Sequence, residues 1–296
     1  MDYDQLITFK KLAQTGSFSN TADSLNITQP AVSKRIALLE SDLKCRLFDR
    51  IGKQNKLTAA GQLALVRVKR ILAESRELKN DVENLSQRIT GHLIISTSHH
   101  IGLHRLPGIL KAYVKLYPDV ELDMRFRDSE IAFDDVLHGN SALAIATLPA
   151  EITDNRISAY PLWLDKLSLV CAANHPLSCI KHLKLKDLES HKAILPGDET
   201  FTRRIINEYF NMNKLSLNIA FETNYLETIK VMVASGLGWS VLPEILAGDD
   251  LHIIPLKSLK LKRMLGVMVN TQMSPTNSST AMINLLKQKS NYRDLA

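Results

Sequence analysis

Apolar residues recur at three- and four-residue spacing near the start of the chain, and this spacing predicts short helices that each bury one face. The first helix is expected over residues 3–13 and ends at Thr15-Gly16-Ser17. Ser17 or Ser19 is the expected cap of a second helix, and Asn26-Ile27-Thr28 turns the chain into a third. The inward residues are Leu6, Ile7, Phe9, Leu12, Ala13, Ala22, Leu25, Val32, Ile36 and Leu39.

The third helix carries polar side chains opposite its apolar face. Thr28 is its expected N-cap, and Pro30 falls in the first turn, where a missing N–H costs nothing. The polar face consists of Gln29, Ser33, Lys34 and Arg35. Two short helices of this kind, joined by a tight turn, are typical of a helix-turn-helix that reads the major groove of DNA. A small helical bundle with solvated basic residues has the same periodicity, so the spacing alone leaves both interpretations open.

Basic residues follow the third helix and lie between two short apolar segments. Leu47-Phe48 precedes Arg50, and Lys53 and Lys56 precede Leu57-Thr58. We interpret this stretch as a hairpin, or wing, whose cations meet phosphates. Residues 1–90 hold 15 Lys+Arg and 10 Asp+Glu, which leaves 22 and 21 for the rest of the chain. The positive excess therefore lies where a polyanion is expected to bind.

We expect a long helix over residues 59–90, capped by Thr58 and ended by Gly91. Its apolar residues alternate steps of four and three, which is the heptad pattern of paired helices. The heptad seam consists of Ala64, Val68, Ile71, Ser75, Leu78, Val82, Leu85 and Ile89. We predict that two chains dimerise through it. Packing of the seam on the C-terminal part of the same chain is the alternative.

The pattern changes to alternating strands and helices from residue 92 onward, which predicts an α/β domain with a parallel sheet wrapped by helices. The expected strands cover residues 92–97, 120–126, 142–148, 167–172, 193–195, 219–222 and 264–269. The expected helices cover residues 102–117, 129–137, 201–211, 225–235 and 281–287. The second βα unit is inserted in the first. We therefore expect one lobe from residues 92–162 and 268–296, and a second lobe from residues 163–267.

Composition excludes several classes of protein. The 296 residues are 45% hydrophobic and 23% charged, which is ordinary for a globular protein, and no apolar run approaches the length that spans a bilayer. The N-terminus lacks the pattern of an export signal, so we expect a cytoplasmic protein with no membrane contact. The three cysteines form no CxxC pair, which argues against a disulfide framework or a thiolate zinc site.

Two groups of residues are expected to line a cleft between the lobes, because ligands of open α/β sheets bind at the carboxyl ends of strands. One group follows strands of the first lobe, and the other surrounds a helix start in the second. The candidate effector-binding residues are Ser98, His99, His100, Thr147, Pro196, Thr200, Phe201 and Thr202. Hydroxyls and helix N-termini that converge on one crevice favour a small organic or inorganic anion. The alternative is that these hydroxyls only cap helices.

Three histidines, His99, His100 and His104, raise the question of a metal site, since the last two have helical i, i+4 spacing. Without a cysteine or carboxylate at ligand spacing, the sequence gives weak support for a metal, and we predict none. For Cys171, inside an apolar strand, we predict a buried inert thiol, with a redox switch involving Cys179 as the alternative.

An enzyme is the main competing function for the α/β part. The chain has no GxSxG elbow, HExxH helix, Walker loop or GxGxxG turn, and no Ser/His/acid set with interpretable spacing. We therefore predict a protein that is not an enzyme and that needs no cofactor. The missing signal-peptide pattern and the predicted DNA-binding head argue against an exported solute-binding protein.

The detailed N-terminal pattern resembles the LysR-type transcriptional regulators. It consists of Leu6, Phe9, Gly16-Ser17-Phe18, Ala22, Leu25, Thr28-Gln29-Pro30-Ala31-Val32-Ser33, Ile36, Leu39-Glu40, Leu47-Phe48, Arg50, Leu57-Thr58 and Gly61. The C-terminal half resembles the effector domain of the same family in Leu106-Pro107, Tyr117-Pro118, Val231 to Gly238 and Leu242-Pro243. Two positions depart from the pattern: Thr21 replaces an alanine, and Lys44 replaces a glycine that ends the recognition region.

The resemblance implies an α/β fold with an all-α N-terminal head: a winged helix-turn-helix (1–58), a linker and dimerisation helix (59–90), and a periplasmic-binding-protein-like two-lobed effector domain (91–296). It implies sequence-specific binding to double-stranded promoter DNA with dyad symmetry, by a dimer or tetramer that responds to a small-molecule effector, with RNA polymerase as a candidate partner. The expected DNA-binding residues are Thr28, Gln29, Pro30, Ser33, Lys34, Arg35, Arg50 and Lys53.

Overall fold

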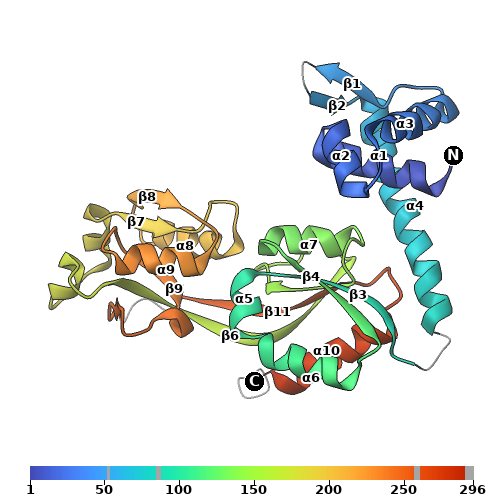
Figure 1. The fold of residues 1–296 in the computed structure, drawn as a ribbon. Helices are drawn as coiled ribbons and strands as arrows, with labels where there is room; N and C mark the ends of the chain where they lie inside the picture. Colours follow the sequence, from blue (N-terminus) through green and yellow to red (C-terminus); the bar gives the residue numbers. More distant parts are fainter. Residues whose placement is uncertain (52–53, 85–87, 257–260, 291–296) are drawn as a thin grey trace. The chain divides into compact units, whose positions relative to one another are not determined.

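The computed structural model describes residues 1–51, 54–84, 88–256 and 261–290 and divides into two compact units, Met1–Leu85 and Ser86–Ala296 (Figure 1). In the part of the chain that is described, no helix has a stretch long and apolar enough to cross a membrane.

The first unit is a winged helix-turn-helix followed by the start of a long helix. Its elements are α1 (Tyr3–Thr15), α2 (Phe18–Leu25), α3 (Gln29–Leu43), β1 (Phe48–Ile51), β2 (Gln54–Leu57) and α4 (Ala59–Asn84). Asp2, Ser17 and Thr28 cap the first three helices, each by accepting a hydrogen bond from a backbone amide of the first turn. The predicted apolar faces meet in one core, which contains Leu6, Phe9, Leu12, Ala22, Val32, Ile36, Leu39, Leu47, Phe48, Val68 and Leu72.

The two departures from the family pattern have local explanations. Thr21 is fully buried, and its hydroxyl lies 2.7 Å from the Thr15 hydroxyl and donates to the carbonyl of Ser17 at 2.7 Å, so the added polar group is satisfied. Lys44 is the C-cap of α3 and has a left-handed backbone, with φ 53° and ψ 30°. Its amide still bonds to the carbonyls of Glu40 and Ser41, so the helix ends as it would with glycine, at a steric cost from the Cβ.

Helix α4 begins as predicted but ends earlier. The Thr58 hydroxyl accepts a hydrogen bond from the Gly61 amide at 2.9 Å, the described helix covers Ala59–Asn84, and residues 88–90, expected to be helical, are not. The start of the heptad seam is not available to a partner, because Val68 packs in the core of the head together with Leu72, one turn further along. At the other end of the seam, Ile89 packs against the core of the second unit.

Part of the predicted seam remains on the surface of α4. Ile71, Leu78 and Val82 are 43%, 66% and 60% exposed, and Ser75 is half-buried between them in sequence. These four residues lie on one side of a helix with 3.6 residues per turn. Leu85 lies outside the residues that the structure describes.

The second unit contains two lobes that share long strands. Its seven-stranded sheet has the order β10-β6-β11-β5-β3-β4, with β9 also paired to β6. The strands of lobe I are β3 (Gly91–Thr97), β4 (Val120–Phe126) and β5 (Leu143–Thr147), which run parallel, and β11 (Lys262–Asn270), which pairs antiparallel with β5. The helices of lobe I are α5 (His99–His104), α6 (Pro107–Leu116), α7 (Ser129–Leu137) and α10 (Asn277–Lys289).

Lobe II has its own core around a smaller sheet. Its elements are β7 (Ala193–Leu195), α8 (Phe201–Met212), β8 (Ile219–Glu222), α9 (Leu226–Ala234), β9 (Ser240–Pro243), β10 (Leu251–Ile253) and short 3-10 turns at Pro176–Cys179, Leu185–Ser190 and Glu244–Leu246. Strands β7 and β8 are parallel. Trp239 and Phe210 stack at the centre of this lobe, with ring centroids 5.7 Å apart.

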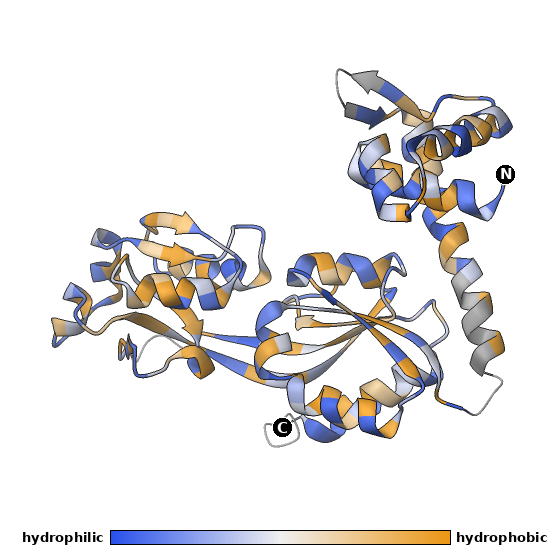
Figure 2. Ribbon diagram, viewed as in Figure 1, coloured by the Kyte–Doolittle hydropathy of each residue, from blue (hydrophilic) through white to orange (hydrophobic). Residues whose placement is uncertain are grey.

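Strand β6 (Ile157–Ala172) is longer than predicted and runs through both lobes. It pairs with β11 from Ile157 to Lys166, and then with β9 and β10 in lobe II. The prediction of a strand only over residues 167–172 was wrong, because the first half mixes polar and apolar residues and gives no buried-strand pattern. Figure 2 shows hydrophilic residues where β6 and β11 pass between the lobes.

Two other boundaries differ from the sequence-based expectation. The helix expected over residues 102–117 is two helices, because Pro107 cannot continue α5 and instead begins α6. We expected the chain to return to lobe I at residue 268. Strand β11 already pairs with β5 of lobe I from Leu265 onward, three residues earlier.

The left-handed Lys44 predicts a stabilising substitution. We expect Lys44→Gly to stabilise the head by about 0.5–1 kcal/mol, because glycine removes the Cβ strain and loses part of that gain to its larger freedom in the unfolded chain. Urea unfolding of the full chain, followed by far-UV circular dichroism, measures this difference. Lys44→Ala keeps the Cβ and serves as the control, and equal stabilisation by both variants would contradict the explanation.

Candidate functional site

The exposed face of α3 carries the residues predicted to read DNA. Thr28, Gln29, Pro30, Ser33 and Lys34 are all exposed, while the opposite face of the same helix is buried in the core of the head. Thr28 also has a structural role, since its hydroxyl accepts a hydrogen bond from the Ala31 amide at 3.4 Å. The face presents an amide, hydroxyls and an ammonium group, which are the groups that bond to base edges and phosphates.

Arg35 differs from the other predicted DNA-binding residues. Its guanidinium donates to the Asp4 carboxylate at 2.5 Å and to the Thr8 hydroxyl at 3.3 Å, both on α1. These contacts direct Arg35 toward the first helix and fix the angle between α1 and α3. Its predicted contact with DNA would require this ion pair to open.

The wing is anchored to the helices on both sides. Glu40 of α3 accepts hydrogen bonds from the amides of Leu47 at 2.7 Å and Phe48 at 3.3 Å, at the start of β1. Asn55 of β2 donates from its backbone and its side chain to the carbonyl of Gly16, both at 3.1 Å. Strand β1 contains Arg50, opposite Asn55 in the hairpin. The side chain of Arg50 and the whole of Lys53 lie outside the described part of the chain.

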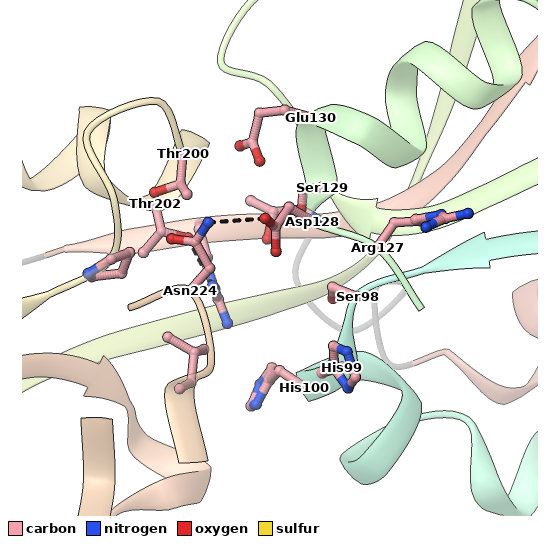
Figure 3. A pocket seen from close by; sticks show the side chains of 14 residues that line it. Ser98, His99, His100, Arg127, Asp128, Ser129, Glu130, Thr200, Thr202 and Asn224 are labelled. Carbon is pink, nitrogen blue, oxygen red and sulfur yellow. Dashed lines mark hydrogen bonds between the residues drawn. The ribbon is translucent and has the colours of Figure 1, made fainter. Parts of the chain in front are cut away.

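A pocket lies between the two lobes of the second unit, where it is lined by both lobes and by the crossing strand β11 (Figure 3). It has a volume of about 50 Å³, which is room for a few waters or one small ion. The lining residues are Ser98, His99, His100, Arg127, Asp128, Ser129, Glu130, Thr147, Pro196, Thr200, Thr202, Asn224, Leu226 and Arg263. Most of the lining residues are of polar type, which suits a small charged or hydroxylated ligand better than an apolar one.

All the effector-binding residues predicted from the sequence line this pocket, except Phe201. The sequence interpretation missed residues 127–130, which directly follow β4, although the rule that selected Ser98 and Thr147 applies equally to that strand. Asn224 and Leu226 follow β8 in the same way. The sequence did not indicate Arg263 as a pocket residue, because it lies within the crossing strand and not at a strand end.

The pocket hydroxyls have different roles. Thr200 is a helix cap: its hydroxyl accepts from the Arg203 amide at 3.1 Å and donates to the Gly197 carbonyl at 2.9 Å. Ser98 is the N-cap residue of α5 but makes no side-chain capping hydrogen bond. The Thr202 hydroxyl accepts from Arg263 at 2.8 Å, which leaves its own proton to donate. Ser98 and Thr202 are therefore better placed than Thr200 to bond to a ligand.

A buried ion pair joins the two crossing strands beside the pocket. Asp165 of β6 accepts from Arg263 of β11 at 2.9 and 3.0 Å, and both side chains are almost fully buried. Arg105 lies 3.3 Å from the other carboxylate oxygen. Burial raises the pKa of Asp165, but the neighbouring His100 and Arg263 outweigh it and hold this pKa at about 2. The carboxylate is therefore ionised and fixed in place.

Two contacts join the lobes across the pocket. The Glu130 carboxylate of lobe I accepts a hydrogen bond from the Phe201 amide, at the N-terminus of α8 in lobe II. The side-chain amide of Asn224 donates to Asp128 at 2.9 Å (Figure 3). Burial raises the pKa of Glu130, against the smaller opposing effect of the hydrogen bond from Phe201. The N-terminus of α8, a favourable position for an anion, thus already holds a carboxylate of the protein.

The three cysteines are free thiols. Cys171 is buried in β6, and burial raises its pKa to about 11, so the thiol stays protonated and unreactive near neutral pH. Cys45 and Cys179 are exposed.

Comparisons with known proteins cover both units. Residues 86–291 match the family described as "LysR substrate binding domain", and residues 3–62 match "Bacterial regulatory helix-turn-helix protein, lysR family". A "Probable RuBisCO transcriptional regulator" from a Synechocystis species is 32% identical over 98% of this chain and 87% of that protein. A relative of the same name from Porphyra purpurea is 30% identical over 90% of this chain and 87% of its own length.

Solved structures show the same fold. Full-length CbnR complexed with its target DNA is similar with a TM-score of 0.66, at 19% identity over 98% of this chain and all of that chain. The effector binding domain of QuiR in complex with shikimate is similar with a TM-score of 0.62, at 18% identity over 69% of this chain and 98% of that chain. The family matches over both units establish that this chain belongs to the LysR family of transcriptional regulators, with a DNA-binding helix-turn-helix and an effector-binding domain, and is not an enzyme.

Proposed function

We propose that α3 reads base edges with Gln29, Ser33 and Lys34, while Thr28 and Pro30 set its approach and Arg50 and Lys53 of the wing meet phosphates. The exposure of this face, opposite a fully packed core, supports the proposal. Gln pairs with adenine in a bidentate manner and Lys donates to guanine, so these side chains supply discrimination between bases. Arg35 joins them only after it leaves Asp4.

We infer that two chains pair through the exposed seam of α4, formed by Ile71, Ser75, Leu78 and Val82. Exposure of three large apolar side chains on one side of a helix is unfavourable in water. Packing against the same helix of a second chain buries them. A pair of heads fits promoter DNA with dyad symmetry, and two pairs make the tetramer. Such a regulator works in the cytoplasm with the chromosome, and RNA polymerase is the partner that carries its effect to transcription.

We propose that the effector is a small anion bound in the pocket between the lobes. Arg127 is half-exposed, and the Nε of its guanidinium lies 3.8 Å from Asp135, a distance too long for a hydrogen bond. The hydroxyls of Ser98 and Thr202 and the N-terminus of α8 complete a set of donors. The observation that carries the proposal is that Glu130 already occupies this N-terminus, as an anionic ligand would. Shikimate, found in the related domain of QuiR, is a carboxylic acid of this general class.

Substitution of the α3 face tests the DNA-binding proposal. We expect Gln29→Ala and Lys34→Ala each to weaken binding to the specific operator by about 1–3 kcal/mol, or roughly 5- to 150-fold, and to change nonspecific binding much less. Gel-shift titrations with the promoter region beside the gene and with a scrambled sequence measure both. Lys44→Ala removes a cation from the other end of the same helix and is the control. Equal losses on both sequences would assign these side chains to phosphate contacts.

A charge in the α4 seam tests dimerisation. We expect Leu78→Glu to dissociate the dimer, because it places a carboxylate in the centre of the apolar seam. Sedimentation equilibrium of the full chain measures the mass. Val66→Glu is the matched control, since Val66 is also 66% exposed but lies on the opposite side of the helix. If both variants remain dimeric, the chains pair through another surface.

Removal of the Glu130 charge tests the anion proposal. We expect Glu130→Gln to raise the affinity for an anionic effector by about three- to tenfold, because Gln keeps an acceptor for the Phe201 amide but no longer repels the anion. Thermal shifts of the full chain with inorganic phosphate and a panel of small carboxylates give the affinities. Glu208→Gln removes an exposed carboxylate elsewhere on α8 and is the control. Tighter binding of a cationic ligand by wild type than by Glu130→Gln would contradict an anion.

A further inference from the structure

Two histidines of lobe I face one carboxylate of lobe II. His100 and His104 lie one turn apart on α5, and Glu227 lies in the first turn of α9. The Nε2 of His104 is 3.1 Å from Glu227 Oε1, and the Nδ1 of His100 is 3.7 Å from the same oxygen. One potential ligand atom from each of the three residues lies within 4.8 Å of the other two. Nitrogen and oxygen ligands of a tetrahedral Zn²⁺ are separated by about 3.3 Å, and the two distances between a histidine and Glu227 lie on either side of this value.

His100 is an unusual buried histidine. It is 4% exposed, and neither ring nitrogen makes a hydrogen bond within the described part of the chain. Its Nδ1 is directed at Glu227, and its Nε2 lies 3.6 Å from Asp165 Oδ2, a distance too long for a hydrogen bond. Buried imidazole nitrogens without partners are costly, so this arrangement needs an explanation.

Asp165 faces the other ring nitrogen of His100. Its carboxylate is held by Arg263 and lies 3.6 Å from Nε2, while Glu227 lies 3.7 Å from Nδ1. With a metal on Nδ1, the ring proton lies on Nε2 and faces Asp165. A histidine that binds a metal through one ring nitrogen usually contacts a carboxylate through the other nitrogen.

We propose that His100 Nδ1, His104 Nε2 and the Glu227 carboxylate bind one divalent transition-metal ion of the Zn²⁺ class, which joins the two lobes beside the effector pocket. Two histidines and one glutamate are a known zinc ligand set, with a fourth position left for water or a ligand. His104 and Glu227 are each about one-third exposed on their side chains, which gives the ion a path from solvent.

The electrostatic surroundings agree with this assignment. The nearby guanidiniums of Arg105 and Arg263 both pair with Asp165, which offsets their repulsion of a cation. His99 takes no part, because its ring packs between Phe126 and Tyr225, with centroid distances of 5.2 and 4.9 Å.

The sequence alone does not show this site. His100 and His104 have helical ligand spacing, but the sequence analysis predicted no metal, because no carboxylate follows at a short interval. Glu227 is 123 residues further along than His104 and reaches it only because α9 of lobe II faces α5 of lobe I. A metal bound here stabilises the closed arrangement of the lobes, and its binding is therefore coupled to that of the effector.

Cobalt titration of the full chain tests the proposal. The untagged protein, with Cys45→Ser and Cys179→Ser to remove the exposed thiols, is freed of metal with a chelator and titrated with Co²⁺, followed by competition with Zn²⁺. We expect saturation at one equivalent, with visible absorption of a four-coordinate cobalt site, and displacement by Zn²⁺. We expect His104→Gln and Glu227→Gln each to weaken Co²⁺ binding at least tenfold.

The control and a second measurement separate the site from adventitious binding. His182→Gln removes an exposed histidine elsewhere in the second unit, and we expect it to leave the affinity unchanged. Hydrogen exchange is expected to slow in α5 and α9 when Zn²⁺ is added to the wild-type sequence, and not in the two ligand variants. Absence of saturable binding, or binding that His104→Gln and Glu227→Gln do not weaken, would overturn the proposal. So would metal-independent stabilisation of the same helices at low pH alone, which would make the histidines simple ion-pair partners.

Discussion

The ion pair between Asp165 and Arg263 is the contact on which the effector domain depends. It joins β6 and β11 at the point where both strands pass from one lobe to the other, and both side chains are almost fully buried. Removal of one partner from a buried pair of this kind costs about 3–5 kcal/mol, because the other charge is left without compensation. The pair also orients its neighbours: Arg263 holds the Thr202 hydroxyl, and Asp165 faces His100. This salt bridge in the crossing strands therefore helps to position two residues of the pocket, Thr202 and His100.

The head is organised by shorter-range contacts. Caps at Asp2, Ser17 and Thr28 set the helix starts, and Glu40 ties the end of α3 to the wing. These contacts involve the buried and lateral sides of α3. On its outer face, Thr28 caps the helix and Gln29 accepts a long hydrogen bond from Ser19 at 3.5 Å, while Ser33 and Lys34 are exposed. This division of one helix into a structural side and a binding side allows the DNA sequence that is read to change without a change in fold.

Much of this fold could be predicted from the sequence, and the parts that could not have physical reasons. Periodicity and caps located α1 to α3 and the parallel strands, since both signals are local. Strand β6 was only half recognised, because its first part crosses between lobes and has no consistent buried face. The burial of Val68 depends on tertiary packing, which a heptad pattern does not report. In the pocket, residues at strand ends were accessible to prediction. Arg263 in the pocket and Glu227 beside it are placed by contacts between segments far apart in the chain.

The Glu130 carboxylate, which accepts a hydrogen bond from the Phe201 amide, competes with anionic ligands for the N-terminus of α8. A tethered carboxylate has a high and constant effective concentration, so a free anion must exceed a threshold before it occupies the end of α8. The strength of that internal contact, rather than the number of contacts offered to the ligand, then sets the concentration range over which the domain responds. A single side chain can in this way adjust sensitivity and leave selectivity untouched.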